Sequence, residues 1–487
     1  MAASSHTAVG HLRPAGAGAA RERRTVVIAL SAATVVAAAL RLPFLGHQSL
    51  WLDETFTRAI VREASLAGVW RHVRATESTP PLYYVLAWLL HARSTVALRL
   101  IPALALVAAV PVGYLAVRRL IGWRSALATA AILAVSPVLV SYATDARAYG
   151  LFVLAALLTV WAFSALVEQS SARRFGLWAA AAVACVWTHY FGIFLIGGEV
   201  LVLFVMCPHA RRAVAGWSAV VLLLVLPLVP LALSQSGDER AEFIAGIPLG
   251  TRFTETVRQF AMGPNVPRTW LEAAGVTIFC AALAAGVIIA CRSDRGSRAL
   301  LAVAVIAFGA PLLLSALGIE DRFYVRNVIV MAPLAAALAA PALLRLHGVP
   351  LALYLALATL TSIWVATDWR YEQVNWKAAL ARAQAIEPNA AVVAVTQMNA
   401  PVIQTYLART QTGPAGLSAT RAWIVVEPVR AAGHRALGPS PVPSLPGFAM
   451  LKSLQVDAVR LVLVRAPRPT RIAPGEIPGA SVFAGEG

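Results

Sequence analysis

The chain has 487 residues, of which 59% are hydrophobic and only 13% are charged, whereas a soluble domain carries about 25% charged residues. Its mean hydropathy of +0.71 excludes a water-soluble globule for most of the chain, so the net charge of +18 is a signal of membrane orientation. No basic run with interleaved aromatic residues indicates binding to nucleic acid. The four cysteines have neither metal-ligand nor redox spacing, so neither a zinc cluster nor a disulfide framework is predicted.

Eleven apolar stretches are predicted to cross a bilayer, whose hydrocarbon core of about 30 Å requires about 20 apolar residues in a helix. They lie near 25–44, 97–117, 125–141, 149–167, 175–189, 190–207, 213–233, 271–291, 299–318, 327–344 and 349–367. The sequence therefore predicts a polytopic α-helical membrane protein with about eleven transmembrane helices.

Arginines occupy every alternate short loop, and cytoplasmic loops are the ones that retain positive charge. These arginines are Arg21, Arg23, Arg24, Arg118, Arg119, Arg124, Arg173, Arg174, Arg211, Arg212, Arg292, Arg295, Arg298 and Arg345. We therefore expect a disordered cytoplasmic tail of residues 1–24 and a domain of residues 25–367 in the cytoplasmic membrane. Its first outer loop would span residues 45–96.

The first outer loop is predicted to contain two short helices. One is amphipathic and lies in the membrane interface, because Leu66, Val69, Trp70 and Val73 follow helical spacing. The other begins after Pro80 and Pro81, since proline suits a first helical turn.

Beyond Thr367 the composition changes to that of a small α/β domain, residues 368–487, outside the membrane. A helix is expected from Asn375 to Ala385, and strands are expected at 391–396, 423–426 and 459–464, where β-branched runs are bounded by turns. The last twenty residues are rich in Pro and Gly, which predicts a loose C-terminal tail.

The sharpest local feature is SLWLDE, Ser49–Glu54, directly after the first predicted helix. Two adjacent carboxylates, Asp53 and Glu54, are costly so close to hydrocarbon unless they are used. Such a carboxylate suits a general base that takes a proton from a hydroxyl or amine acceptor. The residue types fit equally well a helix N-cap at Asp53.

Two further segments carry aromatic and charged residues at the predicted outer face. Tyr83 and Tyr84 are either anchors in the interfacial aromatic belt or contacts for acceptor or lipid. Asp145 and Arg147 lie in the turn between the third and fourth predicted helices, where they either pair with each other or headgroups, or Arg147 binds phosphate.

Polar residues also interrupt later helices. His189, next to Tyr190, is either a packing residue or a base or ligand. Arg322 and Arg326, four residues apart, would share a helical face and grip a phosphate, although snorkelling toward headgroups gives the same pattern. Glu199, inside the sixth predicted helix, is either functional or bonded to a neighbouring helix.

The ordered set SLWLDE, STPPLYYVLAW, ALRLIPAL and SPVLVSYATDARAYGLFVL resembles the N-terminal half of bacterial glycosyltransferase family 39 proteins over about residues 25–345. These are relatives of protein O-mannosyltransferases and of lipid A aminoarabinose transferase in the GT-C superfamily. The stretch DWRYEQVNWKAAL resembles the linker of actinobacterial members. The resemblance implies inverting transfer of a hexose or pentose from a polyprenyl-phosphate donor to a glycolipid, protein or wall polysaccharide of the cell envelope.

The resemblance also implies roles for individual residues. Asp53 would be the catalytic base and Glu54 would help to position acceptor or donor. The residues that match donor-binding motifs are Asp145, Arg147, Tyr149, His189, Tyr190, Arg322 and Arg326, of which the last two would contact the carrier phosphate. Some GT-C enzymes use a divalent metal, but this chain lacks a DxD motif, so no metal ligand is predicted.

A transporter or flippase for a lipid-linked or small polar substrate is the alternative function. Such a protein would carry charges near the membrane midplane or broken helices in corresponding halves. Here the charged candidates other than Glu199 gather at the predicted outer face. An inactive scaffold of the cell envelope is a third hypothesis, and it predicts that Asp53→Asn leaves sugar transfer unchanged.

Overall fold

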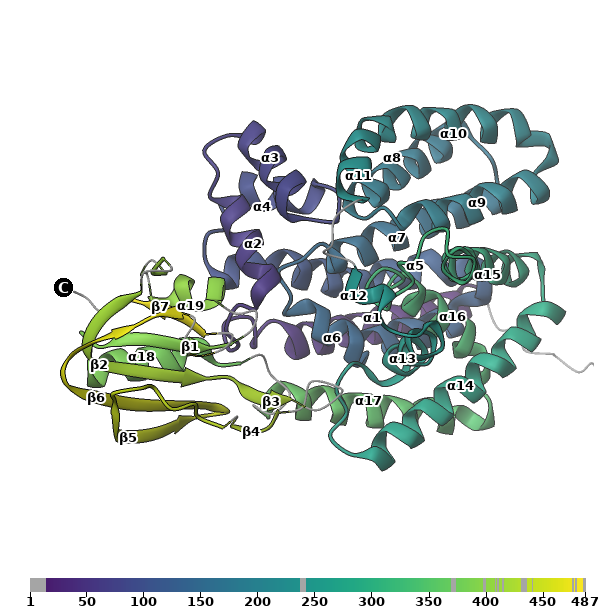
Figure 1. Cartoon of the computed structure of the whole chain (residues 1–487). Coiled ribbons are helices and arrows are strands. Elements are labelled where there is room, and N and C mark those ends of the chain that lie inside the picture. The colour runs from purple at the N-terminus through teal and green to yellow at the C-terminus, as the bar shows by residue number, and fades with distance from the viewer. Residues whose placement is uncertain are drawn as a thin grey trace, which may run out of the picture.

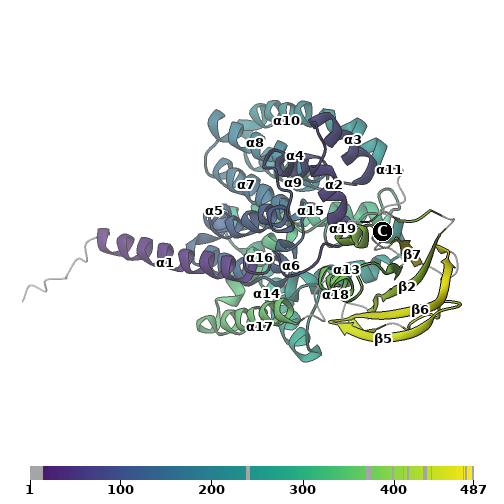
Figure 2. The ribbon, with the colours of Figure 1, turned by 90° about the vertical axis from the view of Figure 1, so that its left-hand side faces the viewer.

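The computed structural model describes residues 15–236, 242–368, 374–396, 400–407, 409, 411–413, 416–430, 436–439, 441–474, 477 and 480–484. A bundle of helices forms the larger part, and a sheet with two helices lies against one end of it (Figure 1). We call the sheet and its two helices the sheet domain. Helix α1 leaves the bundle at the opposite end (Figure 2).

The helices of the bundle coincide with all eleven predicted stretches. In the first half they are α1 (Ala15–Arg41), α2 (Leu52–Val61), α3 (Leu66–Thr76), α4 (Leu82–Leu89), α5 (Thr95–Val135), α6 (Pro137–Ala143), α7 (Tyr149–Glu168), α8 (Ala172–Thr188) and α9 (Gly192–Met206). In the second half they are α10 (Arg211–Val225), α11 (Val229–Ser236), α12 (Glu242–Ala245), α13 (Leu249–Met262), α14 (Thr269–Arg292), α15 (Arg295–Ala316), α16 (Met331–Leu343) and α17 (Val349–Thr367).

Within the described residues, seven helical segments are long and apolar enough to span a bilayer, and α9 and α16 are shorter apolar helices. The chain is therefore a multi-pass helical membrane protein, as the sequence predicts. The predicted tail of residues 1–24 overlaps α1, which already begins at Ala15. Residues 1–14 of that tail lie outside the described residues.

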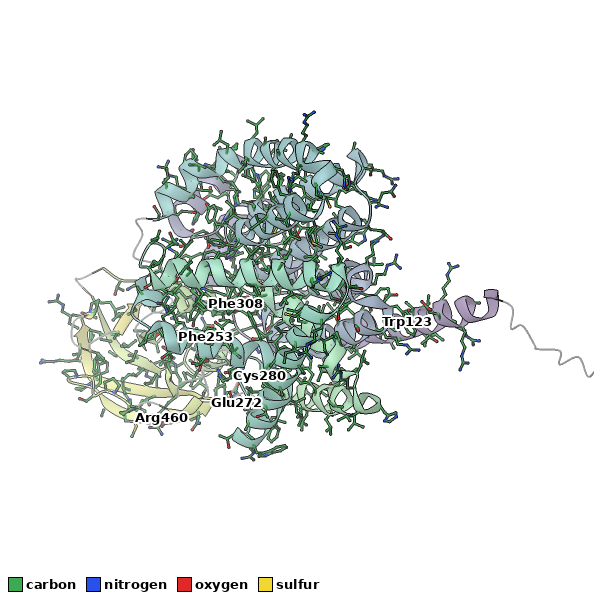
Figure 3. All side chains as sticks on the ribbon, turned by 90° about the vertical axis from the view of Figure 1, so that its right-hand side faces the viewer. Trp123, Phe253, Glu272, Cys280, Phe308 and Arg460 are labelled. Atoms are coloured by element: carbon green, nitrogen blue, oxygen red, sulfur yellow. The ribbon has the colours of Figure 1, made fainter. Side chains whose placement is uncertain are left out.

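Helix α5 contains the second predicted stretch and most of the third, whose last residues lie in α6. Its 41 residues would measure about 60 Å in a straight helix, about twice the hydrocarbon thickness. The helix is broken at Gly122, whose φ of 78° favours glycine. Trp123 beside this break lies at the end of the bundle away from the sheet domain (Figure 3).

Small residues allow close packing in the centre of the bundle. A Cβ at Gly150 of α7 would overlap the backbone of Pro102 in α5, and a Cβ at Gly286 of α14 would overlap the backbone of Leu338 in α16. Helices in a membrane gain little from the hydrophobic effect and depend on such close backbone approach. This packing fixes the helix ends between which the site residues lie.

The loop between α1 and α5 forms three helices, one more than predicted. Ser65 caps α3 by accepting a hydrogen bond from the Gly68 N–H at 3.2 Å. Val69 and Val73 of α3 are buried against Tyr83 and Tyr84 of α4. The additional helix, α2, begins within SLWLDE and carries both of its carboxylates.

The sheet domain confirms the predicted small α/β fold. Its five-stranded sheet has the order β5-β6-β2-β1-β7, in which only β1 and β2 pair in parallel. The strands are β1 (Ala391–Val395), β2 (Leu417–Val426), β5 (Ala449–Val456), β6 (Val459–Ile472) and β7 (Ala480–Phe483), with β3 (Pro428–Arg430) and β4 (Ala436–Pro439) paired separately. Helices α18 (Trp376–Ile386) and α19 (Ala400–Leu407) pack on one face of the sheet.

The prediction of a loose C-terminal tail is wrong for β7. This strand pairs antiparallel with β1, and Val482 and Phe483 are fully buried. Four residues, of which Ser481 is polar, between Pro/Gly-rich segments give too short a pattern to indicate a strand. Their partner lies almost ninety positions earlier in the chain, so the local sequence does not reveal it.

Candidate active site

A cavity of about 1650 Å³ lies where the bundle meets the sheet domain. Most of the predicted site residues line it, namely Asp53, Asp145, Arg147, Tyr149, His189, Tyr190, Arg322 and Arg326. They come from segments far apart in the chain: α2, the turn between α6 and α7, the turn between α8 and α9, and the segment before α16. Glu54, Tyr83 and Tyr84 are not among the lining residues.

Asp53 faces Arg326 across this cavity. The Asp53 Oδ2 and Arg326 Nη1 atoms are 3.8 Å apart, and the two side chains are 25% and 22% exposed, respectively. The Arg326 guanidinium also lies over the rings of Phe243 and Tyr324, at 5.1 and 5.8 Å from their centroids. In the described part of the chain, no group donates a hydrogen bond to the Asp53 carboxylate, which is therefore available to a substrate.

The N-cap interpretation of Asp53 is wrong, because Trp51 occupies the N-cap position of α2. Asp53 lies in the first turn of the helix, where the positive end of the helix dipole stabilises a carboxylate. Its backbone carbonyl accepts a hydrogen bond from Arg147 Nη1 at 3.2 Å. The backbone of Asp53 is thus held, while its side chain points into the cavity.

Glu54 forms a buried ion pair with Arg99 of α5, and both side chains are fully buried. Its Oε1 accepts from Arg99 Nε at 2.7 Å and from the Ala146 N–H at 2.8 Å. Its Oε2 accepts from Arg99 Nη2 at 2.5 Å and from the Trp51 N–H at 3.1 Å. With four donors on its two oxygens and no exposed surface, Glu54 has no atom open to the cavity, so any part in positioning acceptor or donor would be indirect. Glu54 instead joins α2, α5 and the α6–α7 turn.

Arg147 pairs with Glu77 rather than with Asp145. The contact is bidentate, with Nη1 to Oε1 at 2.8 Å and Nη2 to Oε2 at 2.5 Å, and both side chains are buried. Because Glu77 neutralises this guanidinium, the structure does not support Arg147 as the principal phosphate ligand. Glu77, which directly precedes the STPPLYY motif and lines the cavity, is a site residue that the sequence analysis missed.

The prediction that Tyr83 and Tyr84 contact acceptor or lipid is wrong, because both are fully buried. The Tyr83 hydroxyl donates to the Leu98 carbonyl at 3.1 Å. The Tyr84 hydroxyl donates to Glu77 Oε2 at 2.7 Å. Tyr84 therefore holds the Glu77 carboxylate in position for its pair with Arg147.

Asp145 is held by the N-cap residue of α2. Its Oδ1 accepts a hydrogen bond from Trp51 Nε1 at 3.1 Å, and its side chain is partly exposed to the cavity. Burial in the protein, followed by the nearby Glu54 carboxylate, raises the pKa of Asp145 to about 7. The site thus contains a carboxylate that changes charge near neutral pH.

His189 lines the cavity, and its buried ring carries an unpaired hydrogen-bond donor among the described residues. Its ring is buried and stacks on Phe152 with a centroid separation of 4.6 Å. Nδ1 accepts the Phe191 N–H at 3.3 Å, which places the ring proton on Nε2. Nε2 has no partner among the described residues. Buried polar atoms in native proteins are rarely unsatisfied, so this atom indicates a ligand.

Tyr149 and Tyr190 extend the same wall of the cavity. Tyr149 packs edge-on against Tyr142 with their ring centroids 5.1 Å apart. The Tyr190 hydroxyl donates to Gln235 Oε1 at 2.8 Å. The Gln235 amide in turn donates to the Val73 carbonyl of α3 at 3.2 Å. This chain of contacts ties α11 to the first loop.

Arg322 and Arg326 both line the cavity, but they do not lie on a helical face as predicted. The segment from Asp321 to Val330 is not helical, and α16 begins only at Met331. Arg252 of α13 fixes this segment by donating to Asp321 Oδ1 at 2.7 Å and to the Phe323 carbonyl at 3.2 Å. Arg322 pairs with Glu320, with Nε and Oε1 at 3.0 Å.

Glu199 lies outside this cavity and bridges three helices. It accepts hydrogen bonds from Thr159 of α7 at 3.0 Å and from Trp178 Nε1 of α8 at 2.8 Å. These contacts favour the interpretation that Glu199 bonds to neighbouring helices. No group of three or more His, Cys, Asp or Glu side chains in the described ranges is arranged to share a metal ion.

Comparisons with known proteins concern the family and the fold of the chain. A family model described as dolichyl-phosphate-mannose-protein mannosyltransferase matches residues 78–233. No curated protein sequence matches. The fold is similar to that of ArnT from Cupriavidus metallidurans bound to undecaprenyl phosphate, with a TM-score of 0.55, 17% identity, and coverage of 91% of this chain and 98% of ArnT.

The fold is also similar to that of two forms of the oligosaccharyltransferase of Archaeoglobus fulgidus. The form tethered to an acceptor peptide gives a TM-score of 0.50 at 14% identity, with 78% of this chain and 63% of the enzyme covered. The form in complex with an inhibitory peptide and a dolichol-phosphate gives 0.51 at 13% identity, with 79% and 64% covered. This chain therefore spans less than two thirds of the archaeal enzyme.

The fold is thus similar to the folds of ArnT and of the archaeal oligosaccharyltransferase, and residues 78–233 match the mannosyltransferase family model. The family match confirms the resemblance read from the motifs STPPLYYVLAW, ALRLIPAL and SPVLVSYATDARAYGLFVL, whereas SLWLDE lies before the matched residues. The matched residues run from the STPPLYY motif to α11.

Proposed function

We propose that the chain transfers a sugar from a polyprenyl-phosphate donor to an acceptor at the outer face of the cytoplasmic membrane, with Asp53 as general base. The observation that carries this proposal is the position of the Asp53 carboxylate, 3.8 Å from Arg326 in one large cavity. A base for the acceptor and a cation for the phosphate are the two charges that such a reaction needs.

The proposed reaction begins when the donor phosphate competes with Asp53 for Arg326. The separation of 3.8 Å is an ion-pair contact without a hydrogen bond, so a phosphate that accepts directly from the guanidinium can displace it. Asp53 then takes the proton of the acceptor hydroxyl or amine. The acceptor atom attacks the anomeric carbon, the bond from that carbon to the phosphate oxygen breaks, and the configuration inverts.

The leaving polyprenyl phosphate gains negative charge as this bond breaks. Arg326 and Arg322, which line the cavity, are the groups placed to stabilise it. The unpaired Nε2–H of His189 is buried behind the cavity surface and would contribute only if the ring moved. Arg147 supports the site indirectly, because it holds the Asp53 carbonyl while Glu77 balances its charge.

An apolar wall supports a lipid-linked donor. It belongs to the same cavity and is formed by Phe191, Ile193, Phe194, Val225, Leu228, Val229 and Leu233 of α9, α10, α11 and their connections. A soluble nucleotide sugar would not require such a surface, whereas a prenyl chain buries its methylene and methyl groups on it.

We further propose the predicted topology, with a cytoplasmic N-terminus and the sheet domain outside. Arg118, Arg119 and Arg124 flank Trp123, which lies far from the sheet domain (Figure 3). The position of these three arginines away from the sheet domain supports a cytoplasmic location for that end of the bundle, because cytoplasmic loops retain positive charge. In this proposal, residues 25–367 form the catalytic membrane domain and residues 368–487 the outer domain.

The motif order supports placement in glycosyltransferase family 39, and the linker DWRYEQVNWKAAL supports kinship with its actinobacterial members. A transporter or flippase receives less support, because Glu199 is engaged between helices away from the cavity. Identification of the glycosylated product would show whether the acceptor is a glycolipid, a protein or a wall polysaccharide.

Mass spectrometry of envelope glycans and glycoproteins tests the proposed function. A deletion strain should lack one sugar substituent, which identifies both donor and acceptor. The wild-type gene should restore it and the Asp53→Asn gene should not. Full restoration by the Asp53→Asn gene would support the scaffold or transporter hypotheses instead.

A further inference from the structure

We infer that the sheet domain positions the segment that carries Asp53, with Tyr406 and Ser49 as the positioning residues. The inference rests on the proposed function, since Asp53 is the base in that proposal. Helix α19, which contains Tyr406, lies beside α2 in both orthogonal views (Figures 1 and 2).

Two helices of the sheet domain bind consecutive residues of the SLWLDE motif. The Leu50 N–H donates to the Tyr406 hydroxyl of α19 at 2.8 Å. The Lys377 N–H of α18 donates to Ser49 Oγ at 3.0 Å. Ser49 and Leu50 are only 2% and 1% exposed, so water cannot replace a lost partner without local opening. A buried N–H without an acceptor is costly.

The hydrogen bonds continue without a gap toward Asp53. The Ser49 carbonyl accepts from Arg99 Nη2 at 2.8 Å. Trp51 donates through its backbone to Glu54 and through its indole to Asp145, both at 3.1 Å. Helix α2 starts at the next residue, Leu52. A shift of Ser49 or Leu50 therefore moves the first turn of α2 and changes the position of Asp53 relative to Arg326.

The helix that carries Tyr406 is packed into the core of the sheet domain. Val402, Ile403 and Leu407 of the same helix are buried in the core of the sheet domain together with Val392 of β1. The Tyr406 side chain is half-buried and reaches out of this core to the bundle. The sheet domain thus acts on the reaction through Asp53, without a need for its own contact with the sugar.

Tyr406→Phe and Ser49→Ala each remove one of these contacts and keep the rest of the side chain. In the full-length protein in nanodiscs, we expect kcat to fall about tenfold for each, because small misplacements of a catalytic group are expensive. The KM for the polyprenyl-phosphate sugar should stay within about twofold, since Arg322 and Arg326 lie on another segment. Gln404→Ala, on the exposed side of α19, is the matched control and should leave kcat unchanged.

Hydrogen exchange of the peptide containing Leu50 supplies a readout that does not depend on turnover. Tyr406→Phe should speed exchange of the Leu50 amide while α2 and the sheet keep their protection. Unchanged kcat in both variants, a donor KM that rises in step with the fall in kcat, or unchanged Leu50 exchange would overturn the inference. If the wild-type protein has no transferase activity, the proposed function is refuted. If Tyr406→Phe nevertheless speeds exchange of the Leu50 amide, the anchoring role of Tyr406 is still supported.

Discussion

The buried pair of Glu54 and Arg99 provides a prediction whose size follows from the structure. Four N–H groups converge on the two Glu54 oxygens: Arg99 Nε and Ala146 N on Oε1, and Arg99 Nη2 and Trp51 N on Oε2. In Glu54→Gln only one oxygen remains. Whichever way the amide is oriented, two donors face an NH₂ group, and the guanidinium is left buried without its counter-charge.

We expect Glu54→Gln to lower the free energy of unfolding by about 3–5 kcal/mol, the usual cost of removing one partner of a buried ion pair. Domains are stable by only about 5–15 kcal/mol, so the loss is a large fraction of the total. Arg99 also donates to the carbonyls of Leu45, Gln48 and Ser49. The destabilisation should therefore begin in the segment before α2.

Unfolding of the full-length protein by SDS titration in mixed micelles measures this loss. Glu168→Gln is the matched control, because Glu168 pairs with Arg119 at 3.1 Å but is 59% exposed; an exposed pair contributes less than about 1 kcal/mol. Equal unfolding curves for Glu54→Gln and the wild type would refute the conclusion that Glu54 is structural. They would make a direct role at the substrate tenable again.

Three further substitutions test other parts of the site. Arg326→Ala should raise the apparent Kd for a polyprenyl-phosphate sugar about tenfold, while Arg345→Ala at the other end of the bundle should not; equal Kd values would remove Arg326 from the phosphate site. The pKa of Asp145, raised to about 7, lies above that of the unfolded chain. Its contribution to stability is therefore present at low pH and lost as pH rises through about 7. Asp145→Asn should flatten the pH dependence of the unfolding free energy between about pH 4 and 7, and parallel curves for the variant and the wild type would contradict this. Glu199→Gln should cost about 1–3 kcal/mol of stability with unchanged kcat, and loss of turnover in the folded variant would assign it a function.

Hydropathy and charge predicted the membrane-spanning part because each helix shows its own pattern. The eleven apolar stretches, the alternate arginines and the helix after Pro81 are all local signals. The strand β7 and helix α2 were missed, because one depends on a distant pairing partner and the other is too short and polar to stand out. The prediction that Arg322 and Arg326 share a helical face was also wrong because of a distant contact. Arg252 of α13 binds their segment and holds it in a non-helical conformation.

The sequence was enough to locate the site, but it was not enough to assign which charged side chains pair with one another. Polar residues at the ends of apolar stretches identified Asp53, Asp145, His189 and Arg326 as candidates. Spacing cannot show which charges neutralise one another, since Glu54 and Arg99 are 45 positions apart and Glu77 and Arg147 are 70 apart. Two candidates therefore proved to be bound within the protein.

Single-turnover kinetics of Asp53→Asn, with donor binding measured on the same preparation, test the central claim most directly. A general base contributes about 10²- to 10⁴-fold to a rate, so the rate of sugar transfer should fall by that factor. The affinity for the polyprenyl-phosphate sugar should be kept or increased, because Arg326 loses its competing carboxylate. Transfer at the wild-type rate, or donor binding lost together with transfer, would contradict the account.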